Sequence, residues 1–116
     1  MIRVKRVYDA PAGDDGERIL VDRLWPRGIS KDRARITLWW KEAAPSTGLR
    51  EWFRHDPARW EEFCRRYWAE LSGKPDLVRI LKQKTGGEVI TLVYGARDEL
   101  YNNAVALRMF LEGETG

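Results

Sequence analysis

Residues 89–94 (VITLVY) and the turn at residues 95–98 (GARD) decide the fold class of this 116-residue chain. The first segment is apolar and rich in β-branched residues, which is typical of a buried strand. After the turn, apolar residues recur at the spacing of a helix with one buried face: Leu100, Ala104, Leu107 and Leu111. A strand, a loop and a helix in this order predict an α/β fold.

Further strands are predicted in the first third of the chain. Residues 2–8 alternate apolar and basic side chains, which is the period-two pattern of a strand with one buried face. Residues 18–24 contain the apolar run 19–21, which predicts burial on both faces of the sheet. Residues 36–40 combine β-branched and aromatic side chains and favour a third strand, with a helix as the alternative.

The clearest helix is predicted over residues 57–71. Asp56 is a typical N-cap, and Pro57 suits the first helical position because no N–H group is needed there. The expected buried stripe consists of Trp60, Phe63, Cys64, Tyr67, Trp68 and Leu71. Shorter helices are predicted after Ser30 and around residues 49–53. A further helix begins at Pro75, and its expected inward residues are Leu77, Ile80 and Leu81.

These elements predict one small layered α/β domain over residues 1–116, with a short, mainly parallel sheet flanked by helices. The length suits a single domain. Residues 9–16 are short for a parallel crossover, so the pairing direction of the first strand stays open.

Composition excludes several classes of protein. One Cys and one His cannot form an intramolecular disulfide or a four-ligand zinc site. No apolar run is long enough to span a membrane, and the charged start is unlike a signal peptide, so we expect a cytoplasmic protein without a membrane partner. The six Trp residues make an uncovered apolar patch and a homodimer plausible.

The net charge of +3 comes from the N-terminal third of the chain. Residues 1–35 hold nine Lys and Arg against six Asp and Glu, and the remainder is balanced. A basic excess is compatible with a nucleic-acid partner, but no recognisable nucleic-acid-binding module is present in the sequence. Small anionic ligands explain local arginines equally well.

Polar residues gather where two predicted strands end. Residues 22–28 (DRLWPRG) close one strand, and residues 94–98 (YGARD) follow another. Ligands of parallel α/β sheets collect beyond the carboxyl ends of the strands, and free N–H groups at a helix start favour an anion. The residues expected to bind such a ligand are Arg23, Trp25, Arg27, Lys41, Arg97, Asn102 and Asn103.

Asp22 and Asp98 are the candidate catalytic groups, because a carboxylate can orient a hydroxyl group or act as a base. The structural alternative is that both cap turns and that the arginines neutralise them. Lys41 can reach an anion or, if desolvated, form a Schiff base, whereas a solvated lysine is the plainer interpretation.

Other residues offer weaker chemistry. His55 can serve as a general acid or base, or only complete a turn before the next helix. Cys64 lies on an apolar stripe, where a thiol is usually packing. One of Trp39 and Trp40 is expected to be exposed, because adjacent strand residues face opposite sides. The acidic residues of the first loop lack the spacing of a calcium loop, so no metal is assigned, and the sequence specifies no cofactor.

Motifs along nearly the whole chain resemble a known family. They include residues 21–31 (VDRLWPRGISK), 55–57 (HDP), 91–94 (TLVY) and 102–104 (NNA). Their order resembles the YeaO-like branch of the domain-of-unknown-function family 488. The resemblance implies a small bacterial or archaeal cytosolic α/β protein, without implying an activity. Larger members carry a Cys-His-Arg-like segment where this chain has residues 100–103 (LYNN), so the resemblance implies that thiol or imidazole chemistry there is lost.

Two functions follow from the sequence. The first is binding of a small anionic, phosphate- or nucleotide-like ligand at the strand ends, with catalysis as a possible extension. The alternative is a nucleic-acid or protein-binding regulatory module without enzymatic activity, which would use the basic first third of the chain and exposed aromatic residues.

Overall fold

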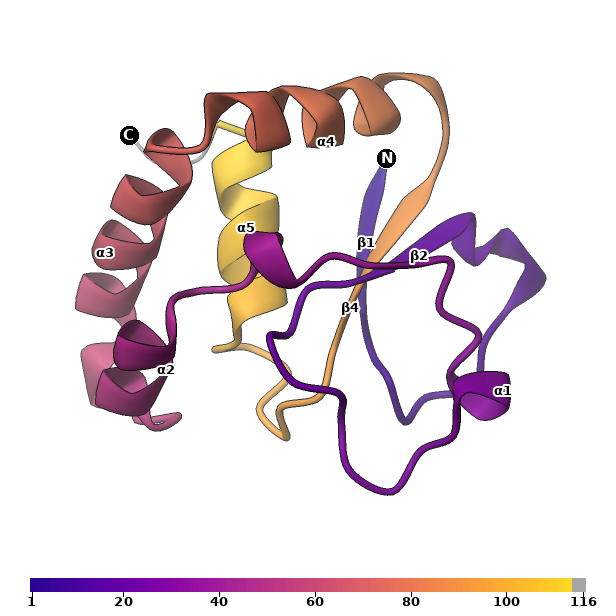
Figure 1. Cartoon of the computed structure of the whole chain (residues 1–116), viewed down its shortest axis with the longest axis horizontal. Coiled ribbons are helices and arrows are strands. Elements are labelled where there is room, and N and C mark those ends of the chain that lie inside the picture. The colour runs from indigo at the N-terminus through magenta and orange to yellow at the C-terminus, as the bar shows by residue number, and fades with distance from the viewer. Residues whose placement is uncertain (114–116) are drawn as a thin grey trace.

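The strand β4 (Ile90–Tyr94) forms the centre of the fold, because it pairs with a strand on each side. The computed structural model describes residues 1–113 and orders the sheet β1-β4-β2-β3 (Figure 1). The other strands are β1 (Ile2–Arg6), β2 (Glu17–Leu20) and β3 (Leu38–Trp39). All three pairings are parallel, so the α/β class and the parallel sheet are confirmed.

The first strand is parallel to its neighbour, which answers the question that the sequence left open. β1 lies beside β4 rather than beside β2, with Val4 opposite Leu92. The connection over residues 7–16 therefore crosses β4. The hydroxyl of Thr91 in β4 donates a hydrogen bond of 2.7 Å to the carbonyl oxygen of Asp15 and fastens the crossing to the sheet.

Helices cover one face of the sheet. Their bounds are α2 (Thr47–Phe53), α3 (Trp60–Ser72), α4 (Pro75–Gly87) and α5 (Asn103–Leu111), and the short α1 (Lys31–Ala34) lies on the other side (Figure 1). Three 3-10 turns are present at η1 (Gly13–Asp15), η2 (Lys41–Ala43) and η3 (Pro57–Arg59). α5 packs directly on β4 and β1, and α3 packs on α5.

Two apolar clusters form the core, one on each face. On the helical face, Ile19, Leu92 and Tyr94 pack against buried residues of α3 and α5, including Tyr67 and Leu107. The second cluster is smaller and consists of Val7, Leu20, Ala34 and Val93, with Trp25 and Trp39 among the residues packed against it. Alternate residues of β2 and β4 face opposite clusters, which confirms the predicted burial on both faces.

The second face also contains a buried charged group. Asp15 is 2% exposed. Its Oδ2 accepts from a guanidinium N–H of Arg18 at 2.7 Å, and its Oδ1 lies 3.2 Å from Lys5 Nζ. Arg18 donates its remaining hydrogen bonds to the carbonyl oxygen of Ala34. Because buried charges need partners, this cluster fixes the crossing connection and α1 relative to the sheet.

Several sequence predictions differ from the structure. Ile80 is 39% exposed and Leu100 is 70% exposed, so neither lies on the expected buried stripe. Leu100 lies outside α5, which begins at Asn103 because the turn before it is longer than expected. Trp39 and Trp40 are both half-buried, one against each cluster, so the expectation of one exposed Trp was wrong.

Gly16 provides a test of the crossing connection. Its φ is +65°, and a Cβ atom would lie 1.9 Å from the carbonyl oxygen of Val89. We expect Gly16→Ala to lower the free energy of unfolding by at least about 2 kcal/mol, because both backbone strain and a backbone clash oppose it. The measurement is urea unfolding of the purified protein.

Gly28 is the matched control, because its φ is +75° but a Cβ atom there meets nothing within 4 Å. Gly28→Ala should cost only about 1 kcal/mol, from the left-handed backbone alone. Equal losses in the two variants would show that the contact with Val89 does not constrain the connection.

Candidate functional site

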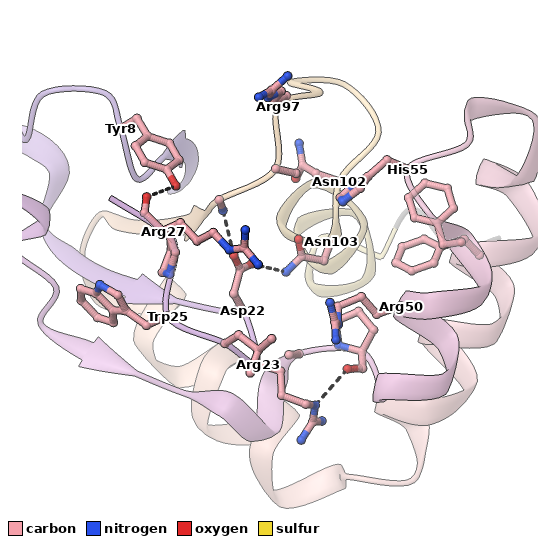
Figure 2. Close-up of a pocket in the computed structure, with 18 residues that line it drawn as sticks. Tyr8, Asp22, Arg23, Trp25, Arg27, Arg50, His55, Arg97, Asn102 and Asn103 are labelled. Atoms are coloured by element: carbon pink, nitrogen blue, oxygen red, sulfur yellow. Dashed lines mark hydrogen bonds between the residues drawn. The ribbon is translucent and has the colours of Figure 1, made fainter. Parts of the chain in front are cut away.

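A pocket of about 480 Å³ lies beyond the carboxyl ends of β2 and β4 (Figure 2). The segments that follow these two strands form its floor and one wall, and α2, α3 and the start of α5 complete it. The lining residues are Tyr8, Asp22, Arg23, Leu24, Trp25, Pro26, Arg27, Ala44, Pro45, Arg50, Phe53, His55, Phe63, Gly95, Ala96, Arg97, Asn102 and Asn103. This is the place that the parallel sheet predicts for a ligand.

Asp22 holds the floor of the pocket together. Its Oδ2 accepts a hydrogen bond of 2.9 Å from the backbone N–H of Gly95, and its Oδ1 accepts one of 3.0 Å from Asn103 Nδ2. The carboxylate therefore joins the end of β2, the end of β4 and the start of α5. The indole N–H of Trp39 donates to the carbonyl oxygen of Asp22 at 2.8 Å and fixes the backbone.

The environment of Asp22 disfavours its charge. Burial raises the pKa of its carboxyl group, and this effect exceeds the opposing hydrogen bonds from Asn103 and Gly95 and the charges of His55 and Arg50. Gly95 must also stay small, because a Cβ atom there would lie 3.0 Å from Asp22 Oδ2 and 3.3 Å from Pro26. The carboxylate of Asp22 is therefore closely packed against Gly95 at the floor of the pocket.

Four arginines line the pocket that contains this carboxylate. Figure 2 shows Arg27 and Arg50 reaching toward Asp22 from different sides, with Arg97 at the edge of the pocket. Within residues 1–113, the guanidinium groups of these three arginines have no hydrogen bond or ion pair. Arg23 turns toward the carbonyl oxygen of Pro45, at 3.3 Å. Three guanidinium groups are therefore available to a ligand.

The loop that carries Arg27 is held by its backbone. Tyr8 donates its phenolic O–H to the carbonyl oxygen of Arg27 at 2.6 Å. The indole N–H of Trp25 donates to the carbonyl oxygen of Ile29 at 2.8 Å, and its ring packs edge-on against Trp39. These contacts fix the loop and leave the Arg27 side chain exposed.

α2 places Arg50 through its N-cap. Ser46 Oγ accepts from the N–H of Leu49, and the same hydroxyl donates to Glu70 of α3 at 2.6 Å. Glu70 also accepts from the backbone N–H of Ser46. One carboxylate therefore anchors the start of α2 on α3, and one helical turn later Arg50 faces the pocket.

The chain reverses sharply after α2 and brings His55 to the pocket. Arg54 and His55 both have left-handed backbone conformations, with φ of 47° and 55°. His55 packs near Phe53 and has an exposed ring. The residue completes a turn, as one interpretation of the sequence expected, and also lines the pocket.

Most of the predicted site residues meet in this pocket. Asp22, Arg23, Trp25, Arg27, Arg97, Asn102 and Asn103 all line it. Asn102 is the N-cap of α5: its Oδ1 accepts from the N–H of Val105, and its Nδ2 donates to the carbonyl oxygen of Asp98. Asn103 donates to Asp22 and to the carbonyl oxygen of Val21.

Two predicted residues lie outside the pocket lining. Lys41 places its Nζ over the ring of Trp39, 4.2 Å from the centroid. Asp98 caps the turn before α5, where its Oδ1 accepts from the N–H groups of Leu100 and Tyr101. These backbone hydrogen bonds lower the pKa of the Asp98 carboxyl group.

The sequence did not identify Arg50, Tyr8, Phe53 and Phe63 as parts of the site. Phe53 and Phe63 stack with ring centroids 4.2 Å apart and give the pocket an aromatic wall. Arg50 reaches the pocket only because Glu70 anchors α2, and no local signal reveals that tertiary contact. Cys64 is buried nearby in the core, where burial raises the pKa of its thiol to about 12.

Comparison with known proteins identifies the family. The family model DUF488-N3i, described as the inactive DUF488-N3 subclade, matches residues 1–116. The chain belongs to DUF488-N3i. A Mycobacterium tuberculosis protein named as uncharacterised is 45% identical over 112 residues, which cover 97% of this chain and 94% of that protein. The uncharacterised protein YeaO of Escherichia coli is 40% identical over 110 residues, 95% of this chain and 96% of YeaO. No solved structure matches this DUF488-N3i chain.

Two kinds of feature, a membrane-spanning helix and a cluster of metal-ligating side chains, are absent from the described residues. Among residues 1–113, no helix is both long and apolar enough to cross a membrane. In the same part of this DUF488-N3i chain, no three His, Cys, Asp or Glu side chains are grouped so that they could hold a metal ion.

Asp98 offers a pH test of its capping role. A carboxyl group whose pKa is lowered by folding stabilises the fold above its unfolded pKa, near 3.8, and loses this contribution as the pH falls toward the lowered value. We expect Asp98→Asn to have a lower urea midpoint than the native chain at pH 7, and the gap to narrow steadily below about pH 4. A gap that is independent of pH would contradict the role of the charge.

Proposed function

We propose that this DUF488-N3i chain binds a small anionic ligand, phosphate- or nucleotide-like, in the pocket at the ends of β2 and β4. One observation carries the proposal: the guanidinium groups of Arg27, Arg50 and Arg97 border one pocket and have no hydrogen-bonding or ionic partner within residues 1–113. Guanidinium groups bind phosphate and carboxylate oxygens through pairs of parallel hydrogen bonds.

The charge balance of the pocket supports an anion. Four arginines line the pocket and Asp22 is its one carboxylate, so the lining carries an excess of positive charge. The volume of about 480 Å³ lies within the usual range of small-molecule sites, about 300–1,000 Å³.

Binding without turnover fits the site better than catalysis. The lining includes no serine, threonine, cysteine or lysine that could act as a nucleophile. Both oxygens of Asp22 accept hydrogen bonds from the protein, and Asp98 is engaged in a turn. The description of the family as an inactive subclade supports the same conclusion.

The first test is a thermal-shift titration with pyrophosphate and with adenosine monophosphate at low and moderate salt. A ligand that binds only the folded chain raises the midpoint of unfolding. We expect Arg27→Ala and Arg50→Ala each to weaken binding at least about tenfold, because each removes a charge-assisted hydrogen bond. The unliganded stability of Arg27→Ala should stay within about 1 kcal/mol of the native chain, since its guanidinium has no partner.

Arg33→Ala is the matched control, because Arg33 is exposed and lies outside the pocket. The substitution removes the same positive charge as Arg27→Ala and Arg50→Ala. It should bind both probes as the native chain does. Equal losses in all three variants would point to a general charge effect. Stabilisation by short DNA or RNA alone, fading with salt, would instead favour the nucleic-acid alternative.

A further inference from the structure

Two neighbouring side chains of the pocket, Asp22 and Asn103, offer hydrogen-bond acceptors. Both N–H bonds of the Asn103 side-chain amide are used, one toward Val21 and one toward Asp22. Since both partners are acceptors, the orientation of the amide is fixed. Asn103 Oδ1 accepts no hydrogen bond within residues 1–113, and no buried side-chain oxygen there lacks a partner, so this oxygen is open to solvent.

The carboxylate of Asp22 has spare capacity as well. An ionised carboxylate offers about four acceptor positions, and Gly95 and Asn103 occupy two of them. No ion pair of Asp22 is formed within residues 1–113. Asp22 and Asn103 Oδ1 therefore present neighbouring acceptors to whatever occupies the pocket.

The arginines of the lining have the opposite character. Arg27, Arg50 and Arg97 carry donors only, because a guanidinium group has no acceptor. Phe53, Phe63, Trp25 and Pro26 give the same pocket an apolar lining. A ligand that is anionic throughout would place an oxygen against Asp22, which cannot donate to it while ionised.

We propose that the ligand is bipolar: a phosphate monoester whose body carries, apart from the phosphate, a pair of O–H or N–H donors. The phosphate binds the arginines, and the donors bind Asp22 and Asn103 Oδ1, so that Asp22 determines specificity. Vicinal diols and primary amines share this chemistry. The inference rests on the proposed anion-binding function and adds what the pocket selects.

The test compares phosphate esters that differ only in their donors. Adenosine monophosphate is paired with its dideoxy analogue, which lacks both ribose hydroxyls, and phosphoethanolamine is paired with ethyl phosphate, which lacks the amine. By isothermal titration of the native chain, we expect the donor-bearing member of at least one pair to bind at least about tenfold more tightly. The pair that shows the preference distinguishes a diol from an amine.

Variants test whether the preference for donor-bearing esters depends on Asp22. Asp22→Asn should reduce the ratio of the two affinities to near one, whereas Asp32→Asn, an exposed carboxylate outside the pocket, should preserve it. Equal affinity within both pairs for the native chain would overturn the bipolar ligand and leave anion binding intact. If the native chain binds neither these esters nor pyrophosphate, the proposed function itself fails. The comparison on the native chain decides the inference even if Asp22→Asn does not fold.

Discussion

The parallel pairing of β4 with strands on both sides is the constraint on which the rest of the structure depends. All five residues of this strand are buried, so each face needs its own cover. The helical face supplies Tyr67 and Leu107, while the other face is closed by a loop crossing and α1. The crossing contains only the 3-10 turn η1, and polar contacts hold it: the hydroxyl of Thr91 donates to the backbone of Asp15, and Asp15 pairs with Arg18. The same parallel arrangement brings the carboxyl ends of β2 and β4 side by side, where the pocket forms.

At those strand ends, the carboxylate of Asp22 links the neighbouring segments through hydrogen bonds. Asp22 accepts from Gly95 and Asn103 and so ties two strands to one helix across more than seventy residues of sequence. Burial raises the pKa of Asp22, which means that the folded chain holds this charge at a cost in stability above the ordinary pKa of an aspartate. An apolar residue would avoid that cost. Such a residue would also leave the backbone N–H of Gly95 and one N–H of the Asn103 amide without these partners, so the carboxylate serves as a structural link at the strand ends.

Much of this arrangement could be predicted from the sequence, because local patterns carry it. The period of apolar residues predicted α3 and the buried faces of β2, and the strand ends pointed to Asp22, Arg27 and Arg97. The wrong predictions concern residues whose burial depends on tertiary contacts. Leu100 continues the helical spacing of α5 but lies in the turn that Asp98 caps, and Trp39 and Trp40 are both covered because each face has its own cluster. Arg50 had no local signal, since its place depends on Glu70 holding the start of α2.

Asn103 shows how the structure changes the meaning of a correctly predicted residue. From the sequence, its position at a helix start suggested a donor for an anion. In the pocket its N–H groups are consumed by Val21 and Asp22, and the atom left for a ligand is an acceptor. The pocket thereby presents both donors and acceptors: arginines line it, and carboxylate and amide oxygens lie among them. A ligand that is anionic throughout offers these acceptors no donor, and an unpaired acceptor in a partly buried place costs free energy. The proposed ligand would pair both kinds of group, with its phosphate on the arginines and its donors on Asp22 and Asn103 Oδ1.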